Sequence, residues 1–356
     1  MAKPLRHGYT TGACAAAAAK GAALMLRDQR LVEAVELPLP AGFSATFALR
    51  GQRFDQERAA CFVVKDAGDD PDVTHGCEVH GEVVFRSGVT AGVEIVGGVG
   101  VGRVTKPGLA VAVGEWAINP VPRRMIETAL AEVLPGRALR VILSIPDGME
   151  RAGRTLNARL GILGGLSILG TSGVVRPISH QAWTDTLEVA LDVALAAGCQ
   201  TVVLATGRSS ELAAQQRFAL AAEAFIMMGD HVGYALEACH RRGFPRIVLA
   251  AQFAKLVKVA CGHPQTHVHS SQMDLQQLAR WGGRLGLDAA ASKQIECANT
   301  AREVFAGHPQ AQLLVAEVAH RALEQMGGRA PGAQLEILLV DYAGAPAGHF
   351  VKGSGL

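Results

Sequence analysis

The stretch HGYTTGACAAAAAKGAALML, residues 7–26, sets the architecture expected of the first half of the chain. Alanine is the best helix former, and five consecutive alanines at 15–19 predict a helix that carries almost no side chains. The helix is expected to begin at Thr10, Thr11 and Gly12, whose hydroxyls and free amides would form an anion site at its N-terminus. Tight packing of a bare helix against a sheet is the alternative explanation, and the residues leave both open.

Composition limits the class of protein. The 356 residues are 49% hydrophobic and 19% charged, which is enough apolar material for one large domain or two ordinary ones. No run reaches the roughly 18 apolar residues of a membrane helix, and residues 1–10 lack the apolar segment of a signal peptide, so we expect a cytoplasmic protein without a membrane partner. A net charge of +2 argues against nucleic acid as the main partner. Seven cysteines without a C-x-x-C pair argue against a disulfide framework.

Short β-branched or alternating segments follow the alanine helix. Gly and Asp-Pro turns separate them, which indicates a largely antiparallel sheet. The segment 119–136 is expected to form a helix, since Asn119 can cap it, Pro120 suits its first turn and Pro135-Gly136 ends it. This half is therefore expected to be an α+β domain, residues 1–150. Its strands are expected at 34–39, 45–50, 60–66, 77–85 and 93–97.

In the second half of the chain, continuous apolar runs alternate with helical segments. Such runs are typical of strands buried on both faces, and the alternation predicts a doubly wound, mainly parallel α/β domain, residues 151–356. Ligands of these sheets bind outside the carboxyl ends of the strands. The runs are 138–145, 201–207, 246–252 and 334–341, and the helices are expected at 181–197, 209–223, 231–242, 274–286, 290–305 and 312–326.

Asp66, Asp69 and Asp70 crowd the segment KDAGDDPDVTHG (65–76), directly after an expected buried strand. Crowded carboxylates raise one another's pKa and attract cations, although a polar turn with local caps explains them equally well. The segment lacks the closing glutamate of a calcium loop. The chain also lacks the glycine motifs that bind dinucleotides or nucleotide phosphates.

Lysines are rare in the chain, which has eight of them. Lys106 is expected in a turn, and Lys255 and Lys258 are expected to share one face of a helix at the spacing i, i+3. His267 belongs to a histidine-rich segment that follows, but no carboxylate or cysteine stands at a metal-ligand spacing from it. We therefore expect no metal site.

Several segments in a fixed order carry a resemblance to a known family. They are HGYTTGACAAAAAKGA, DAGDDPDVTHG, VTKPGL, AINPVPR, residues 157–173, TVVLATGR, MMGDHVGYALE and FAKLVKVACGHPQTH. Together they closely resemble the cobalt-precorrin-5B C1-methyltransferase (CbiD) family of cobalamin biosynthesis, from Arg6 to about Asp341. Trp116 departs from this pattern, where the family often has proline, and Thr171-Ser172-Gly173 stands in place of TTG.

The resemblance implies methyl transfer from S-adenosylmethionine, as co-substrate, to C1 of a cobalt-containing tetrapyrrole, on an unusual two-domain α/β fold. The many carboxylates of such an acceptor require cations and amide donors, whereas an acidic loop would stabilise the sulfonium or the ribose hydroxyls of the donor. A non-catalytic tetrapyrrole carrier and a nucleotide-dependent α/β enzyme are the alternatives. Whether the protein forms a homo-oligomer stays open.

Site residues are assigned on this basis. The acidic loop supplies the catalytic candidates Asp66, Asp69 and Asp70. The candidates for binding S-adenosylmethionine are Thr206, Gly207, Gly229, Asp230, Gly170 and Thr171. The candidates for binding the tetrapyrrole are Thr10, Thr11, Gly12, Lys106, Lys255, Lys258 and His267.

Overall fold

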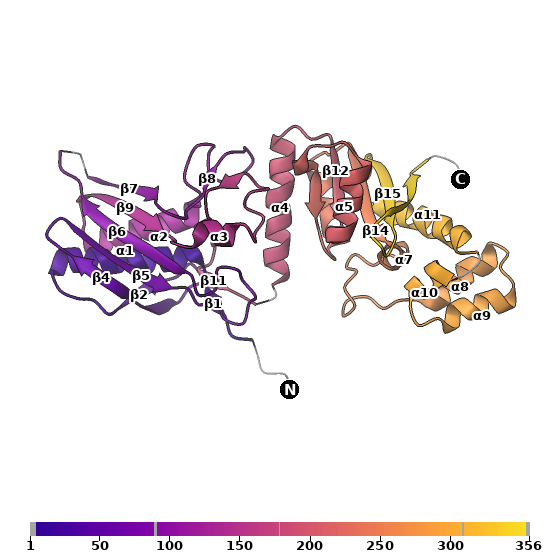
Figure 1. Cartoon of the computed structure of the whole chain (residues 1–356), viewed down its shortest axis with the longest axis horizontal. Coiled ribbons are helices and arrows are strands. Elements are labelled where there is room, and N and C mark those ends of the chain that lie inside the picture. The colour runs from indigo at the N-terminus through magenta and orange to yellow at the C-terminus, as the bar shows by residue number, and fades with distance from the viewer. Residues whose placement is uncertain (1–4, 89–90, 178, 308–309, 354–356) are drawn as a thin grey trace. The chain divides into compact units, whose positions relative to one another are not determined.

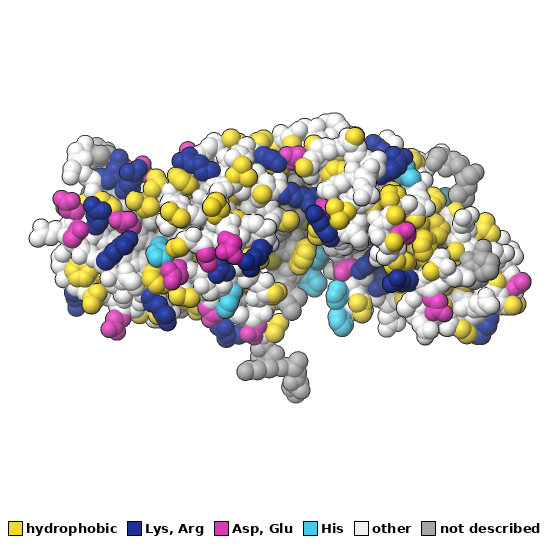
Figure 2. Space-filling model, in the orientation of Figure 1, with side chains coloured by type: hydrophobic (Ala, Val, Ile, Leu, Met, Phe, Trp, Pro, Cys, Tyr) yellow, Lys and Arg dark blue, Asp and Glu magenta, His cyan; other side chains and the backbone are white. Residues whose placement is uncertain are grey.

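A computed structural model of the chain describes residues 5–88, 91–177, 179–307 and 310–353. It contains two compact units, Met1–Ser179 and His180–Leu356, each with its own hydrophobic core (Figure 1). No helix in these described ranges is long and apolar enough to cross a lipid bilayer. On the face drawn in Figure 2, basic and acidic side chains are interspersed over the surface.

The first unit is an α+β structure. Its helices are α1 (Thr11–Asp28), α2 (Pro120–Val133) and α3 (Gly148–Ala152). Its strands are β1 (Gly8–Tyr9), β2 (Ala34–Pro38), β3 (Ser44–Ala48), β4 (Arg50–Phe54), β5 (Arg58–Val64), β6 (Glu78–Phe85), β7 (Gly92–Gly97), β8 (Arg103–Val104), β9 (Ala138–Ser144), β10 (Ile162–Leu163) and β11 (Val174–Val175).

The main sheet of this unit has the strand order β4-β5-β6-β9-β7. Neighbouring strands are antiparallel except for the parallel pair β7 and β9, and β2 and β3 form a separate antiparallel hairpin. The expected α+β domain with a largely antiparallel sheet is therefore confirmed. The grouping of 138–145 with the parallel strands was wrong, because β9 pairs with β6 and β7 and its burial alternates along the strand.

The alanine helix α1 is buried along nearly its whole length, between strands β5 and β6 on one side and α2 on the other. Small residues allow this close contact. A Cβ atom at Gly81 of β6 would lie only 2.9 Å from the backbone nitrogen of Ala19. The bare surface of the helix thus serves packing against a sheet, the structural alternative left open by the sequence.

The two units divide after Ser179, later than the expected boundary at 150. The reason is that the intervening segment pairs with strands of the first unit. Strand β10 pairs with β8, and β11 pairs with β1, the first strand of the chain. Figure 1 shows β1 and β11 side by side.

The second unit is the expected doubly wound α/β structure. Its helices are α4 (His180–Ala196), α5 (Arg208–Arg217), η1 (Ala222–Ala224, 3₁₀), α6 (Val232–Arg241), α7 (Phe253–Ala260), α8 (Leu275–Arg284), α9 (Ala289–Cys297), α10 (Ala301–Gly307) and α11 (Ala311–Arg329). Its strands are β12 (Thr201–Ala205), β13 (Phe225–Met227), β14 (Arg246–Gln252), β15 (Gln334–Val340) and β16 (Pro346–Val351).

Strands of the second unit follow the order β13-β12-β14-β15-β16, all parallel except β16 at the edge. Alternate strand residues enter two cores: Val202 and Leu204 pack with α4, α6, α7 and α11, whereas Val203 and Ala205 pack with α5. Both faces of the sheet are therefore covered by helices, which explains why its strands are continuously apolar. The helix expected at 290–305 is divided into α9 and α10.

Candidate functional site

The strand order of the second unit defines where a ligand is expected to bind. Across the sheet the parallel strands are β13, β12, β14 and β15. The chain therefore runs in one direction from β12 to β13 and in the other from β13 to β14 and β15, so the winding reverses between β12 and β14. In doubly wound sheets the ligand crevice lies at this reversal, outside the carboxyl ends of the strands. Thr206 and Gly207 follow β12, Gly229 and Asp230 follow β13, and Lys255 lies in α7, which follows β14.

Thr206 and Gly207 form the turn between β12 and α5. The amide of Thr206 donates to the carbonyl of Ala250 in β14 at 3.2 Å, and its hydroxyl lies 3.3 Å from that of Ser210. Nothing lies within 4 Å of where a Cβ atom would stand on Gly207. A ligand can therefore approach the backbone of this turn closely.

Asp230 is held by two donors that use the same carboxylate oxygen. The Lys255 ammonium and the Thr266 hydroxyl both donate to Oδ1, the latter at 2.6 Å. Burial opposes the charge, but these hydrogen bonds outweigh it and lower the pKa of the Asp230 carboxyl. Asp230 is thus an anion at neutral pH, and its side chain is 24% exposed.

Lys258 and His267 belong to the same region of the second unit. Lys258 is buried, and its ammonium donates to the carbonyl of Thr266 at 2.9 Å. Burial and the nearby charge of Lys255 lower the pKa of Lys258. His267 is exposed and directly follows Thr266. Four residues assigned to two different ligands, Asp230 for the donor and Lys255, Lys258 and His267 for the acceptor, therefore lie together around Thr266.

The acidic loop of the first unit is neutralised within the protein. Asp66 forms an ion pair with Arg6, which lowers the pKa of the carboxyl to about 2, and it also accepts from the amide of Gly68 at 2.9 Å. Asp69 accepts from the amide of Arg6 at 2.6 Å. Asp72 pairs with the buried Lys65 at 2.6 Å. The loop is held in place by these contacts, and Asp70 within it is half-buried.

Thr10, Thr11 and Gly12 are buried, and the protein uses their polar groups itself. Thr10 caps α1 by accepting from the amide of Ala13 at 3.2 Å. The Thr11 hydroxyl donates to the carbonyl of Ser167 at 3.1 Å and accepts from the amide of Leu169 at 3.0 Å. The amide of Gly12 donates to the carbonyl of Leu169 at 2.9 Å. These groups fix the segment before Gly170 to the start of α1.

The other candidates of the first unit lie in two separate places. Lys106 packs its aliphatic chain over Gly161 and donates to the carbonyl of Arg159 at 3.3 Å. Gly170 packs against Thr10, with a positive φ of +129°. Thr171 lines a cavity of about 400 Å³ between β2 and α2. Gly170 and Thr171 thus belong to a different unit from the other four residues assigned to the methyl donor.

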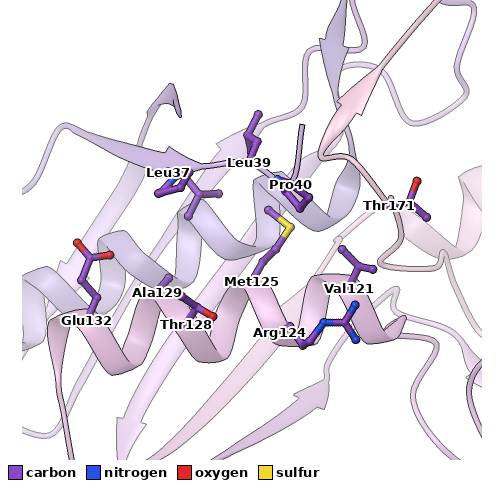
Figure 3. Close-up of a pocket in the computed structure, with 11 residues that line it drawn as sticks. Leu37, Leu39, Pro40, Val121, Arg124, Met125, Thr128, Ala129, Glu132 and Thr171 are labelled. Atoms are coloured by element: carbon purple, nitrogen blue, oxygen red, sulfur yellow. The ribbon is translucent and has the colours of Figure 1, made fainter. Parts of the chain in front are cut away.

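That cavity is mainly apolar (Figure 3). Leu37 and Leu39 come from the β2 side, and Met125 points toward them from α2. Arg124 and Glu132 add charge to the lining, but Glu132 is paired with Lys20 of α1 at 3.0 Å. The volume lies within the range of small-ligand sites.

Sequence reasoning missed the residues that organise the edge of the parallel sheet. Thr266 contacts Asp230, Lys255 and Lys258, although its only signal in the sequence was a place in the segment HPQTH. Ser210 was missed because one helical serine carries no pattern. Within the described ranges, no three His, Cys, Asp or Glu side chains lie together as metal ligands would.

Comparison with known proteins places the chain in a family. The family model CbiD matches residues 1–177, and the model of the CbiD C-terminal domain matches residues 265–349. The cobalt-precorrin-5B C(1)-methyltransferase of Geobacter metallireducens is 55% identical, and the alignment covers 96% of this chain and 97% of that protein. The chain belongs to the CbiD family.

Other CbiD relatives give the same result. The protein of the same description from Pelobacter propionicus is 53% identical over 96% of this chain and 95% of its own length. The one from Priestia megaterium is 46% identical over 85% and 83%, respectively. A crystal structure described as cobalamin biosynthesis protein (cbiD) from Archaeoglobus fulgidus shares 28% identity, with a TM-score of 0.38, and the match covers 71% of this chain and 78% of that one.

Proposed function

We propose that the protein transfers the methyl group of S-adenosylmethionine to C1 of cobalt-precorrin-5B, giving cobalt-precorrin-6A in the anaerobic route of cobalamin biosynthesis. The observation that carries this proposal is the 53–55% identity, over nearly the whole chain, to relatives described as cobalt-precorrin-5B C(1)-methyltransferases. Cobalt enters as part of the substrate. We place the reaction in the cytoplasm, which is consistent with seven free cysteines.

The donor site in this proposal lies at the reversal of the parallel sheet. Thr206 and Gly207 give S-adenosylmethionine close access to the backbone after the first strand. Asp230 follows the second strand, the place where an acidic residue binds ribose hydroxyls in dinucleotide-binding sheets, about 20 residues after the glycine turn. Because Lys255 and Thr266 both use Oδ1, Oδ2 is the oxygen assigned to the ribose.

The chemistry requires alignment more than covalent help. The C1 carbon attacks the methyl group with an electron pair of the conjugated ring, and a carbon–carbon bond forms. The carbon–sulfur bond breaks with its electron pair left on sulfur, so the positive charge passes to the tetrapyrrole and S-adenosylhomocysteine leaves with a neutral sulfur. Holding carbon, methyl and sulfur in line supplies most of the acceleration in such a step. The carboxylate of Asp230 favours binding of the cationic donor, and this attraction weakens once the sulfonium charge is gone.

We retain Lys255 and His267, both in the second unit, as contacts for the acetate and propionate groups of the acceptor, and assign Lys106 of the first unit to its contact with the Arg159 carbonyl. The Lys255 side chain is 32% exposed and His267 is exposed, as recognition of a polyanion requires. Lys258 is instead assigned to support of the Thr266 carbonyl, since it is buried there. The buried Thr10, Thr11 and Gly12 are assigned to the structure of the first unit, and the acidic loop with Asp66, Asp69 and Asp70 to its folding.

A single experiment tests the activity. The purified protein is incubated with cobalt-precorrin-5B and methyl-labelled S-adenosylmethionine, and the tetrapyrrole is analysed by mass spectrometry. We expect one labelled methyl group per tetrapyrrole and an equal amount of S-adenosylhomocysteine, without NAD(P)H or ATP. Binding of the tetrapyrrole without methyl transfer would instead identify a carrier.

A further inference from the structure

Three aromatic side chains of the second unit form a cluster beside the loop that carries Asp230. Trp183 of α4 and His231, at the start of α6, lie nearly parallel, with 6.4 Å between ring centroids and 28° between ring planes. His180 meets His231 edge to face at 5.5 Å. His180 and Trp183 both lie in α4, but His231 is 48 residues further along the chain, so no sequence pattern groups the three residues.

The indole of Trp183 is placed over the backbone of that loop. A Cβ atom on Gly229 would lie 3.9 Å from the indole, and Gly229 has a positive φ of +60°, which a residue without a side chain adopts at little cost. The side of the loop next to Trp183 is thus bare backbone. Trp183 is nevertheless 49% exposed. A large aromatic surface therefore remains uncovered beside Gly229, the residue directly before Asp230.

The cluster is fixed from a second direction. The amide of Gln265 lies 3.4 Å from Nδ1 of His231, and the next residue, Thr266, binds Asp230. Burial and the neighbouring His180 lower the pKa of the His231 imidazole, against the opposing effect of Asp230. A neutral imidazole offers a flat face without charge. The ring pair and the carboxylate are therefore supported by one segment, 264–267.

We propose that the ring pair of Trp183 and His231 is the surface on which the adenine ring of the methyl donor stacks. This inference rests on the donor site proposed above, in which Asp230 holds the ribose. The purine is attached directly to the ribose, so it must lie within a few ångströms of Asp230, where the exposed indole is found. An indole face and a purine face stack favourably, and removing such an aromatic side chain weakens binding of a base by about tenfold or more.

The test compares three variants by calorimetric titration with S-adenosylhomocysteine. We expect Trp183→Ala to weaken binding about tenfold, and Trp183→Phe to recover most of the affinity, because a ring remains. Leu195→Ala is the matched control, since Leu195 lies on the same helix and is 46% exposed. It should bind like the wild type. Far-ultraviolet circular dichroism and unfolding curves verify that each variant is folded.

A second readout uses the indole itself. Trp183 is one of three tryptophans, so stacking of adenine on it should quench part of the intrinsic fluorescence when S-adenosylhomocysteine is added. The quenching should be lost in Trp183→Phe even though binding persists. Quenching that is the same in Trp183→Phe and the wild type would overturn the proposal.

The outcomes separate this inference from the proposed function. If the wild type methylates cobalt-precorrin-5B while Trp183→Ala keeps wild-type affinity for S-adenosylhomocysteine, the adenine surface is wrong and the reaction stands. If the wild type yields no methylated tetrapyrrole but Trp183→Ala still loses affinity, the adenine surface stands and the reaction is wrong.

Discussion

The ammonium of Lys255 donates a hydrogen bond to Oδ1 of Asp230, joining α7, after β14, to the loop after β13. Strand β12 lies between those two strands in the sheet. The ion pair therefore connects the neighbours on either side of β12, at the edge where Thr206 and Gly207 leave that strand. The residues proposed to bind the methyl donor are held together by contacts that exist before any ligand arrives.

Asp230→Asn should weaken binding of S-adenosylhomocysteine by about tenfold to a hundredfold. The substitution keeps the size of the side chain but removes the charge, and hydrogen bonds to charged groups are worth about 1.5–3 kcal/mol. The KM for cobalt-precorrin-5B should change much less. Calorimetry and steady-state kinetics measure the two quantities.

Asp341→Asn is the control for that prediction. Asp341 follows β15 at the same edge of the sheet, but its Oδ1 accepts from the amides of Ala343 and Ala345 and so closes a turn. Its substitution should leave donor affinity unchanged. Equal affinities for Asp230→Asn and the wild type would remove Asp230 from the donor site.

Thr11→Val should lower the free energy of unfolding without changing the KM for the tetrapyrrole. Valine has nearly the same shape as threonine but leaves the carbonyl of Ser167 and the amide of Leu169 without their buried partner, at a cost of about 1–3 kcal/mol. Urea unfolding measures the loss, and Thr46→Val on the exposed face of β3 serves as the control. If folded Thr11→Val instead showed a raised KM for the tetrapyrrole, the anion site expected at the start of α1 would be supported.

Glu336→Ala should destabilise the second unit strongly. Glu336 is 1% exposed and accepts two hydrogen bonds from Arg246, at 2.6 and 2.9 Å, and lies 2.8 Å from Nε2 of His349. Removing the carboxylate leaves the Arg246 guanidinium without its partner, but that side chain is 33% exposed and water replaces part of the interaction, so we expect a loss of about 1–3 kcal/mol. Chemical denaturation monitored at neutral pH gives the value.

The same group makes stability depend on pH. Burial opposes ionisation of Glu336, but the contacts with Arg246 and His349 outweigh it. The pKa of the Glu336 carboxyl in the folded protein therefore lies below its ordinary value of 4.5. The ionised Glu336 therefore contributes fully to the free energy of unfolding above pH 4.5. This contribution declines as the pH falls through the lower pKa that Glu336 has in the folded protein. The difference in unfolding free energy between the wild type and Glu336→Gln should shrink over that acidic range; a constant difference would contradict the assignment.

The sequence was sufficient for both fold classes but not for every strand. The runs 201–207, 246–252 and 334–341 were assigned correctly, because strands buried on both faces are apolar throughout. β13 was missed because it has only three residues, and β4 because RGQRF is polar. The run 138–145 was misplaced, since an apolar segment alone does not reveal its neighbours in a sheet.

The candidate site divides in the same manner. Thr206 and Gly207 could be placed at the carboxyl edge of the sheet, because they follow a run that was recognised as a parallel strand. Gly229 and Asp230 could not be placed there by the same reasoning, since the strand before them, β13, was missed. The sequence could not predict that Lys255 binds Asp230 or that Lys258 binds Thr266. These contacts depend on how α7 packs against the segment 264–267. Trp183 was missed because a single tryptophan in a helix forms no pattern.

The pairing of β1 with β11 has a consequence for how the protein is made. Gly8 and Tyr9 leave the ribosome among the first residues, yet their partners Val174 and Val175 are among the last of the first unit to be translated. The β1–β11 pair therefore cannot form until nearly the whole unit has been made, although α1 and the five-stranded sheet on which it packs end by Ser144. A gene cut at codon 150 would thus encode that sheet but leave β1 and β8 without their partners β11 and β10, whereas a cut after codon 179 would keep both pairs.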